Sequence, residues 1–168
     1  KMKKTDVLVI GGSAAGMVVS LTGKATYPEK SFTMIKKQKD VMVPCGIPYI
    51  FGTLDSSQLN IMPVDNMMEK AGVTSLVGEV VAIDKGAKSA RLADGEIIEY
   101  EKLVLATGST PVVPRWLKGG DKKNVYTVPK DRIYLDEMKE KLAGCRRVVV
   151  IGAGFIGVEF SDEFAKHG

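Results

Sequence analysis

The sequence has few of the residues that bind metals or cross-link secreted proteins. Its 168 residues include two cysteines, Cys45 and Cys145, and a single histidine, His167. Two cysteines so far apart supply neither a disulfide framework nor the paired spacing of a zinc site. We therefore expect no metal site and a reducing, cytoplasmic location.

Long hydrophobic runs are also absent. No apolar stretch approaches the roughly 20 residues of a membrane span, so we expect no membrane partner. The start, KMKKTDVLVIGG, leads directly into a strand pattern and does not resemble a signal peptide. Lys1 precedes Met2, and we expect Met2 to be the native start.

Aromatic residues are scarce where positive charge is concentrated. Residues 1–39 hold eight lysines against Asp6 and Glu29, but only Tyr27 and Phe32 could stack on bases. We therefore expect no nucleic-acid partner. The charge favours a solvated basic face, and the phosphates of a nucleotide or coenzyme A are the alternative.

Two glycine-rich segments are the strongest positive signal. VLVIGGSAAG covers residues 7–16 and VVVIGAGFIGVE covers residues 148–159. Each joins an apolar β-branched run to a helical pattern, which is the context of a dinucleotide-binding turn. The alternative for each is a strand–turn–helix with incidental glycines.

Glycines at these turns let the backbone approach a pyrophosphate, whose charge the helix N-terminus stabilises. The second motif is complete, with Gly152, Gly154 and Gly157. The first has serine at its middle position, in Gly11-x-Ser13-x-x-Gly16. Two such sites predict electron transfer between two cofactors.

Hydrophobic periodicity and turn residues predict the secondary structure. A helix over 65–71 is expected to have Asp65 as its N-cap, and Asp94-Gly95 predicts a hairpin. The expected strands cover 7–10, 31–36, 76–83, 89–92, 97–100, 103–106 and 147–151, and the expected helices 14–24, 49–52, 65–71, 131–143 and 155–166.

These elements predict an α/β protein. Residues 1–112 are expected to form a Rossmann-like dinucleotide-binding domain, a parallel sheet with helices plus a small antiparallel β-meander. Residues 113–168 are expected to supply a linker, a helix and the first strand–helix unit of a second Rossmann domain. A parallel βαβ unit needs a further strand, so we expect the chain to be truncated inside this second domain.

Five motifs in order carry a family resemblance: GGSAAG, PCGIPYIFG, GEVVAID, EYEKLVLATGSTP and VVVIGAGFIGVEF. The chain resembles the pyridine nucleotide–disulfide oxidoreductases, flavoproteins that pass a hydride from NAD(P)H through FAD to a cysteine. It is most similar to the branch with coenzyme A disulfide reductase, NADH oxidase and NADH peroxidase. The resemblance spans nearly the whole chain but only about the front third of a typical member.

The resemblance implies that residues 1–112 form the FAD-binding domain and that residues 113–168 begin the NAD(P)H-binding domain. It also implies roles for individual residues. Val80 would contact the adenine of FAD through its backbone, and Glu159 would lie near the nicotinamide. The FAD pyrophosphate would be held by Gly11, Gly12, Ser13, Ala14 and Gly16, the FAD site lined by Thr107 and Gly108, and the NAD(P)H pyrophosphate received by Gly152, Gly154 and Gly157.

Cys45 is the candidate catalytic residue. It follows Pro44 and precedes a short helical piece, a placement that favours the reactive thiolate; a small buried hydrophobe is the alternative. No second cysteine lies nearby, so an internal dithiol is absent. The resemblance then implies either a mixed disulfide with coenzyme A or a sulfenic acid that reduces oxygen or peroxide. Cys145 is expected to be structural.

Two positions depart from the family pattern. Ala14 stands where peroxidase and oxidase members usually have histidine, which favours the coenzyme A disulfide type. The ribose-binding acid is expected about 20 residues after the motif, where this chain has Lys36. Either FAD is held with altered ribose contacts, which we favour, or the site prefers a phosphorylated ligand.

The predicted function is therefore an FAD-dependent NAD(P)H oxidoreductase that reduces a small disulfide, such as coenzyme A disulfide, or oxygen or peroxide through Cys45. A homodimer is implied for the full-length enzyme. The alternative is an FAD-binding module or inactive remnant without turnover. The sequence leaves open the electron acceptor, the choice between NADH and NADPH, and the oligomeric state.

Overall fold

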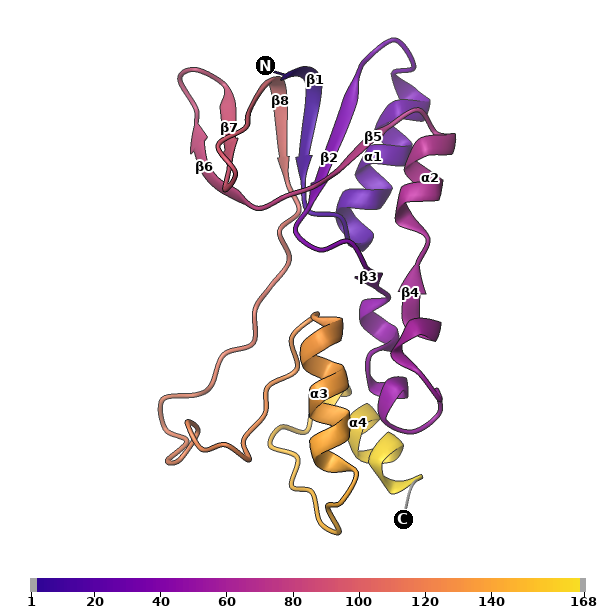
Figure 1. The fold of residues 1–168 in the computed structure, drawn as a ribbon, viewed down its shortest axis with the longest axis vertical. Coiled ribbons are helices and arrows are strands. Elements are labelled where there is room, and N and C mark those ends of the chain that lie inside the picture. Colours follow the sequence, from indigo (N-terminus) through magenta and orange to yellow (C-terminus); the bar gives the residue numbers. More distant parts are fainter. Residues whose placement is uncertain (1–2, 167–168) are drawn as a thin grey trace. The chain divides into compact units, whose positions relative to one another are not determined.

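A computed structural model describes residues 3–166 and divides the chain into two compact units (Figure 1). The first unit comprises the chain up to Val41 together with Met62–Gly108. The second comprises Met42–Ile61 and the chain from Ser109 onward. His167 and the predicted start at Met2 lie outside the described residues. The boundary between residues 112 and 113 stays a prediction.

The first unit is built on a six-stranded sheet (Figure 1). Its four parallel strands continue into an antiparallel meander, as the predicted fold class requires. In order across the sheet, the strands are β5 (Thr74–Val77), β2 (Phe32–Lys36), β1 (Lys3–Ile10), β8 (Ile97–Leu105), β7 (Ser89–Leu92) and β6 (Val80–Asp84).

Side chains of β1 alternate between two cores because successive residues of a strand point to opposite faces. Val9 packs with residues of α1 (Ala14–Thr26) and α2 (Val64–Lys70), two helices that lie side by side (Figure 1). Leu8 and Ile10 pack instead with meander residues such as Leu92 and Ile98. Apolar burial on both faces thus fixes the central strands.

Three local predictions need correction. The strand expected over 76–83 is two strands, β5 and β6, separated at Gly78. The strands expected over 97–100 and 103–106 are one continuous strand, β8, since it pairs with β1 on one side and β7 on the other. Asp65 lies in the first turn of α2, and the N-cap is Pro63.

The predicted hairpin at Asp94-Gly95 is confirmed. Leu92 N–H donates to the Glu96 carbonyl over 2.8 Å, and β7 and β8 pair antiparallel on either side. Gly95 has a φ of +90°, a conformation that is easily reached only by glycine.

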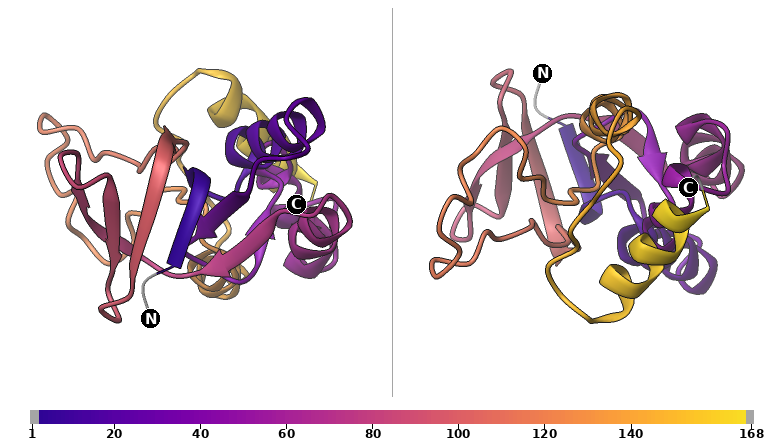
Figure 2. Two further views of the ribbon diagram at one scale, coloured as in Figure 1. Left: turned by 90° about the horizontal axis from the view of Figure 1, so that it is seen from above. Right: turned by 90° about the horizontal axis from the view of Figure 1, so that it is seen from below.

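The regular structure of the second unit is mostly helical, and long irregular segments connect its helices (Figure 2). The chain enters and leaves it through two short paired strands, β3 (Val41–Met42) and β4 (Ile61–Met62). Its core contains Met42, Ile47, Ile50, Phe51, Leu135, Met138 and Phe160. Its helices are the 3₁₀ turns η1 (Pro44–Gly46), η2 (Pro48–Phe51) and η3 (Ser57–Asn60), and the α-helices α3 (Arg132–Leu142) and α4 (Phe155–Ala165).

The predicted strand over 147–151 is wrong. Within the described residues this segment forms no strand and pairs with none, and Val149 is 84% exposed. A lone extended segment has no neighbour for its N–H and C=O groups. Residues 3–166 also include no helix long and apolar enough to cross a membrane.

Candidate functional site

The first glycine turn is closed by backbone contacts that exclude side chains. Gly11 follows β1 with a φ of +120°, and its N–H donates to the Ile35 carbonyl over 2.8 Å. A Cβ on Gly11 would overlap the Ala106 carbonyl, and one on Gly16 would overlap the Gly11 carbonyl. The turn therefore needs glycine at both ends.

Helix α1 begins directly after this turn with Ser13 as its N-cap. The Ser13 side chain makes no capping hydrogen bond, and the first turn of α1 has no acidic residue. Nothing on Ser13 or in that first turn therefore offsets the positive end of the helix dipole, which favours an anionic ligand.

Other predicted FAD residues lie at the same edge of the parallel sheet. The Ala106 N–H donates to the Ile10 carbonyl over 2.8 Å, which places Thr107 and Gly108 next to the glycine turn. Lys36 ends β2 at this edge, and its carbonyl accepts from Gly78 N–H over 2.9 Å. Ligands of open α/β sheets bind at such carboxyl ends. Val80 stands two residues beyond Gly78, as the first residue of β6.

Lys36 is buried, and its charge is paired inside the unit. Its side chain is 3% exposed, and its Nζ donates to Asp65 Oδ2 over 2.8 Å and to the Lys39 carbonyl over 2.7 Å. Ser75 Oγ donates to the other Asp65 oxygen over 2.8 Å. The hydrogen bond from Lys36, helped by Ser75 and opposed by partial burial, lowers the pKa of Asp65.

Asp65 was missed as a site residue because its predicted role was an N-cap. A usable signal was present, since a lysine in an otherwise buried strand requires a counter-charge. The sequence did not indicate which acid supplies it.

Other lysines of the basic stretch are also paired. Lys3 lies 2.8 Å from Glu96 and Lys37 lies 2.7 Å from Glu79. The stretch is therefore not a uniformly cationic face.

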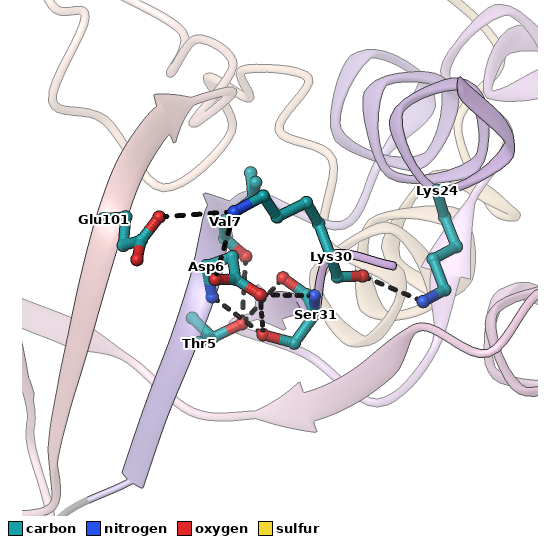
Figure 3. Close-up of polar contacts among 7 residues, drawn as sticks. All are labelled: Thr5, Asp6, Val7, Lys24, Lys30, Ser31 and Glu101. Carbon is teal, nitrogen blue, oxygen red and sulfur yellow. Dashed lines mark hydrogen bonds and ion pairs between the residues drawn. The ribbon is translucent and has the colours of Figure 1, made fainter. Parts of the chain in front are cut away.

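A polar network joins β1 to the residue before β2 (Figure 3). Asp6 Oδ2 accepts from both the N–H and the hydroxyl of Ser31 over 2.7 Å. Lys30 lies 3.8 Å from both Asp6 and Glu101, and Lys24 donates to the carbonyls of Pro28 and Lys30. The backbone hydrogen bond from Ser31, followed by the one from its hydroxyl, lowers the pKa of Asp6.

The second glycine turn repeats the local geometry of the first. Gly152 has a φ of +121°, and Gly154 is the extended N-cap of α4. A Cβ on Gly157 would overlap the Gly152 carbonyl, as in the first turn. Ser161 Oγ donates to the Gly157 carbonyl over 2.8 Å, as Ser20 does to Gly16. Glu159 is exposed on α4.

Cys45 lies in η1 of the second unit with an exposed side chain. Its exposure does not fit the alternative of a small buried hydrophobe. Asn60 supports the segment by donating to the Val43 carbonyl over 3.1 Å. Cys145 is exposed as well, so packing gives no reason for the structural role expected of it.

Helix α4 packs on the segment that follows Cys45. Phe51 contacts Phe160 and Phe164, with ring centroids 5.2 and 5.6 Å away. Glu163, 2% exposed, accepts from the Thr53 N–H over 2.7 Å and from Lys166 Nζ over 2.6 Å. Burial alone would raise the pKa of Glu163, but the hydrogen bonds from Lys166 and Thr53 outweigh it and lower that pKa. No local pattern in the sequence indicates this contact, because Thr53 and Glu163 lie 110 positions apart.

No three histidine, cysteine or acidic side chains gather as a metal site in residues 3–166. The family model described as pyridine nucleotide-disulphide oxidoreductase matches residues 5–168. The chain is 36% identical to an NAD(P)H sulfur oxidoreductase (CoA-dependent) of Pyrococcus abyssi, with 100% of this chain and 38% of that protein covered. It is 31% identical to an NADH oxidase of Methanocaldococcus jannaschii, with 92% and 36% covered.

Among solved structures, an NAD-dependent persulfide reductase from A. fulgidus matches with a TM-score of 0.79 and 27% identity. That match covers 96% of this chain and 32% of the other. The chain thus spans between about a third and two fifths of the length of these three relatives. It belongs to the pyridine nucleotide-disulphide oxidoreductase family, which supports FAD and NAD(P)H as the cofactors expected from the sequence.

Proposed function

We propose that this chain is part of an FAD-dependent NAD(P)H oxidoreductase that acts on a sulfur substrate through Cys45. The observation that carries the proposal is the pair of glycine turns with matching backbone geometry, at Gly11 and Gly152. The names of both relatives support an NAD(P)H-dependent oxidoreductase, and the name of the sulfur oxidoreductase also supports the sulfur substrate.

The residues of the first turn fit FAD. The space beside Gly11 and Gly16 is filled by the chain's own backbone, at Ala106 and Gly11, which keeps the turn tight, and the start of α1 favours a pyrophosphate. Gly12, Ser13, Ala14, Thr107 and Gly108 complete the proposed FAD set, with Val80 at the adenine. When bound, FAD supplies two-electron transfer between a nicotinamide and a thiol or disulfide.

The second turn, with Gly154 and Gly157, is proposed to receive NAD(P)H, with Glu159 toward its nicotinamide. A cytoplasmic location and a homodimer in the longer protein stay predictions.

Cys45 is proposed as the thiolate that reacts with substrate. It attacks one sulfur of a disulfide such as coenzyme A disulfide, releases the other sulfur as a thiolate and becomes a mixed disulfide. Two electrons originating from NAD(P)H then cleave that bond and restore both thiolates. The exposure of Cys45 gives a substrate disulfide access to it.

The test uses the longer protein that contains this chain, loads it with FAD, adds NADH and coenzyme A disulfide, and measures the free thiol released. We expect release to be lost in Cys45→Ser and kept in Cys145→Ser, a matched control because Cys145 is also exposed. Release that survives Cys45→Ser would contradict the role of Cys45. NADH oxidation without thiol release would identify oxygen as the acceptor.

A second candidate is an FAD-binding module without turnover. It is favoured for the 168-residue chain alone because residues 147–151 form no strand in the described structure, so the second turn lacks the sheet that normally supports it. Bound flavin that NADH cannot reduce would support this candidate.

A further inference from the structure

We propose that Asp65, held in place by the buried ammonium of Lys36, replaces the missing ribose-binding acid and makes the first glycine turn select an unphosphorylated ribose. This inference rests on the proposed binding of FAD at that turn. It concerns the position where the sequence has a donor and the motif expects a carboxylate acceptor.

The side chain of Lys36 contacts the glycine turn at Gly12. A Cβ on Gly12 would lie 2.5 Å from Lys36 Cβ and 3.4 Å from its Cγ and Cδ. The aliphatic stem of Lys36 therefore runs along Gly12. Its ammonium, two bonds beyond Cδ, reaches Asp65 and the Lys39 carbonyl.

The charge of the Lys36 ammonium is already paired inside the protein. An unpaired ammonium at this place would attract a phosphate on the ribose 2′ position. The Lys36 ammonium is instead buried and bonded to Asp65 Oδ2 and the Lys39 carbonyl. Breaking a buried ion pair by removing one partner leaves an uncompensated charge, which is costly. Lys36 is thus held away from a phosphate by Asp65.

The Asp65 carboxylate can accept further hydrogen bonds. An ionised carboxylate offers about four acceptor sites, and Lys36 and Ser75 each use one. The Asp65 side chain is 57% exposed. Asp65 can therefore accept the hydroxyls of a ribose while it keeps both internal partners.

The experiment measures the affinity of the chain for ADP and for adenosine 2′,5′-bisphosphate by calorimetry, with FAD retention measured in parallel. The wild type is expected to prefer ADP. Asp65→Asn is expected to weaken the binding of ADP by at least about tenfold, because the loss of one hydrogen bond to a charged group has an effect of about that size. It is also expected to strengthen the binding of the bisphosphate, because the Lys36 ammonium loses its anionic partner.

A second pair of variants keeps the test valid if Asp65→Asn does not fold. Lys36→Met removes the buried charge and leaves Asp65 bonded to Ser75. Lys36→Met with Asp65→Asn removes both charges. ADP should bind the double variant at least about tenfold more weakly than Lys36→Met, and neither should gain affinity for the bisphosphate.

Asp6→Asn is the matched control, since Asp6 is also a serine-bonded carboxylate of the first unit; it should leave both affinities unchanged. Equal ADP affinities of Lys36→Met and the double variant would overturn the inference. If both variants still retained FAD, the proposed function would stand. A wild type that binds neither FAD nor ADP would overturn both.

Discussion

Gly11 and Gly152 have the same sequence role but different surroundings. Both have φ near +120°, yet a Cβ on Gly11 would overlap the Ala106 carbonyl and one on Gly152 would meet nothing within 4 Å. Backbone strain at such a φ costs a side chain about 1–3 kcal/mol. The overlap adds to that cost only at Gly11.

We therefore expect Gly11→Ala to lower the free energy of unfolding by more than about 3 kcal/mol and Gly152→Ala by no more than that. Urea denaturation followed by circular dichroism measures both. Equal losses in the two variants would show that the contact with Ala106 does not matter.

Asp6 makes a pH-dependent contribution to stability. Its pKa in the folded chain lies below the ordinary value of 3.8, chiefly because of Ser31. Such a group stabilises the fold above its unfolded pKa, and the contribution is lost as pH falls through the folded pKa.

Asp6→Asn should therefore lower the melting temperature at neutral pH. The difference from the wild type should vanish in acid below the folded pKa. Thermal melts of both proteins across this range test the sign, and a difference that grows toward low pH would contradict it.

Lys36 and Asp65 show which part of the site could be predicted from the sequence and which part could not. The spacing from the glycine motif located Lys36 as the anomalous position, and the structure places it beside Gly12. Its partner Asp65 lies 29 residues away, and no local pattern connects two such residues. Long-range pairing of a buried charge depends on the packed sheet.

At the scale of elements, α4 is held to the second unit by one face. Phe160 is 3% exposed and Phe155 is 90% exposed, although both belong to the same helix. Truncating a buried phenylalanine typically costs about 3–5 kcal/mol. An exposed one costs within about 0.5 kcal/mol.

Phe160→Ala should thus strongly destabilise the second unit, whereas Phe155→Ala should not. Hydrogen exchange of the α3 and α4 amides would report the difference. Similar protection in both variants would mean that α4 does not depend on Phe160 and its contacts with Phe51 and Phe164.

Periodicity predicted the elements well where they were locally determined. α1 and α4 follow their glycine turns, and α3 starts after Asp131, whose side chain accepts from the Tyr134 N–H over 3.1 Å. The prediction failed where pairing with other strands determines the extent of a strand. β8 is one long strand because it pairs with β1 on one side and with β7 on the other. Residues 147–151 have strand composition but no partner strand in the described structure.

At the scale of the whole molecule, the two glycine turns belong to different compact units, and Cys45 shares a unit with the second turn. The motif order predicted a flavin site, a cysteine and a nicotinamide site. It did not predict that residues 42–61 form a compact unit with the region after Ser109, because contacts such as Glu163 with Thr53 span 110 positions.

Flavin binding at the first turn is the property on which the proposed function depends most directly. The decisive measurement is the visible absorption spectrum of the purified chain after FAD is added and the excess removed, with Gly16→Val beside it. For the wild type we predict flavin absorption that corresponds to about one bound FAD per chain. We predict no flavin absorption for Gly16→Val, whose side chain would overlap the Gly11 carbonyl. A wild-type chain without flavin bands, or equal bands in a folded Gly16→Val, would contradict the account.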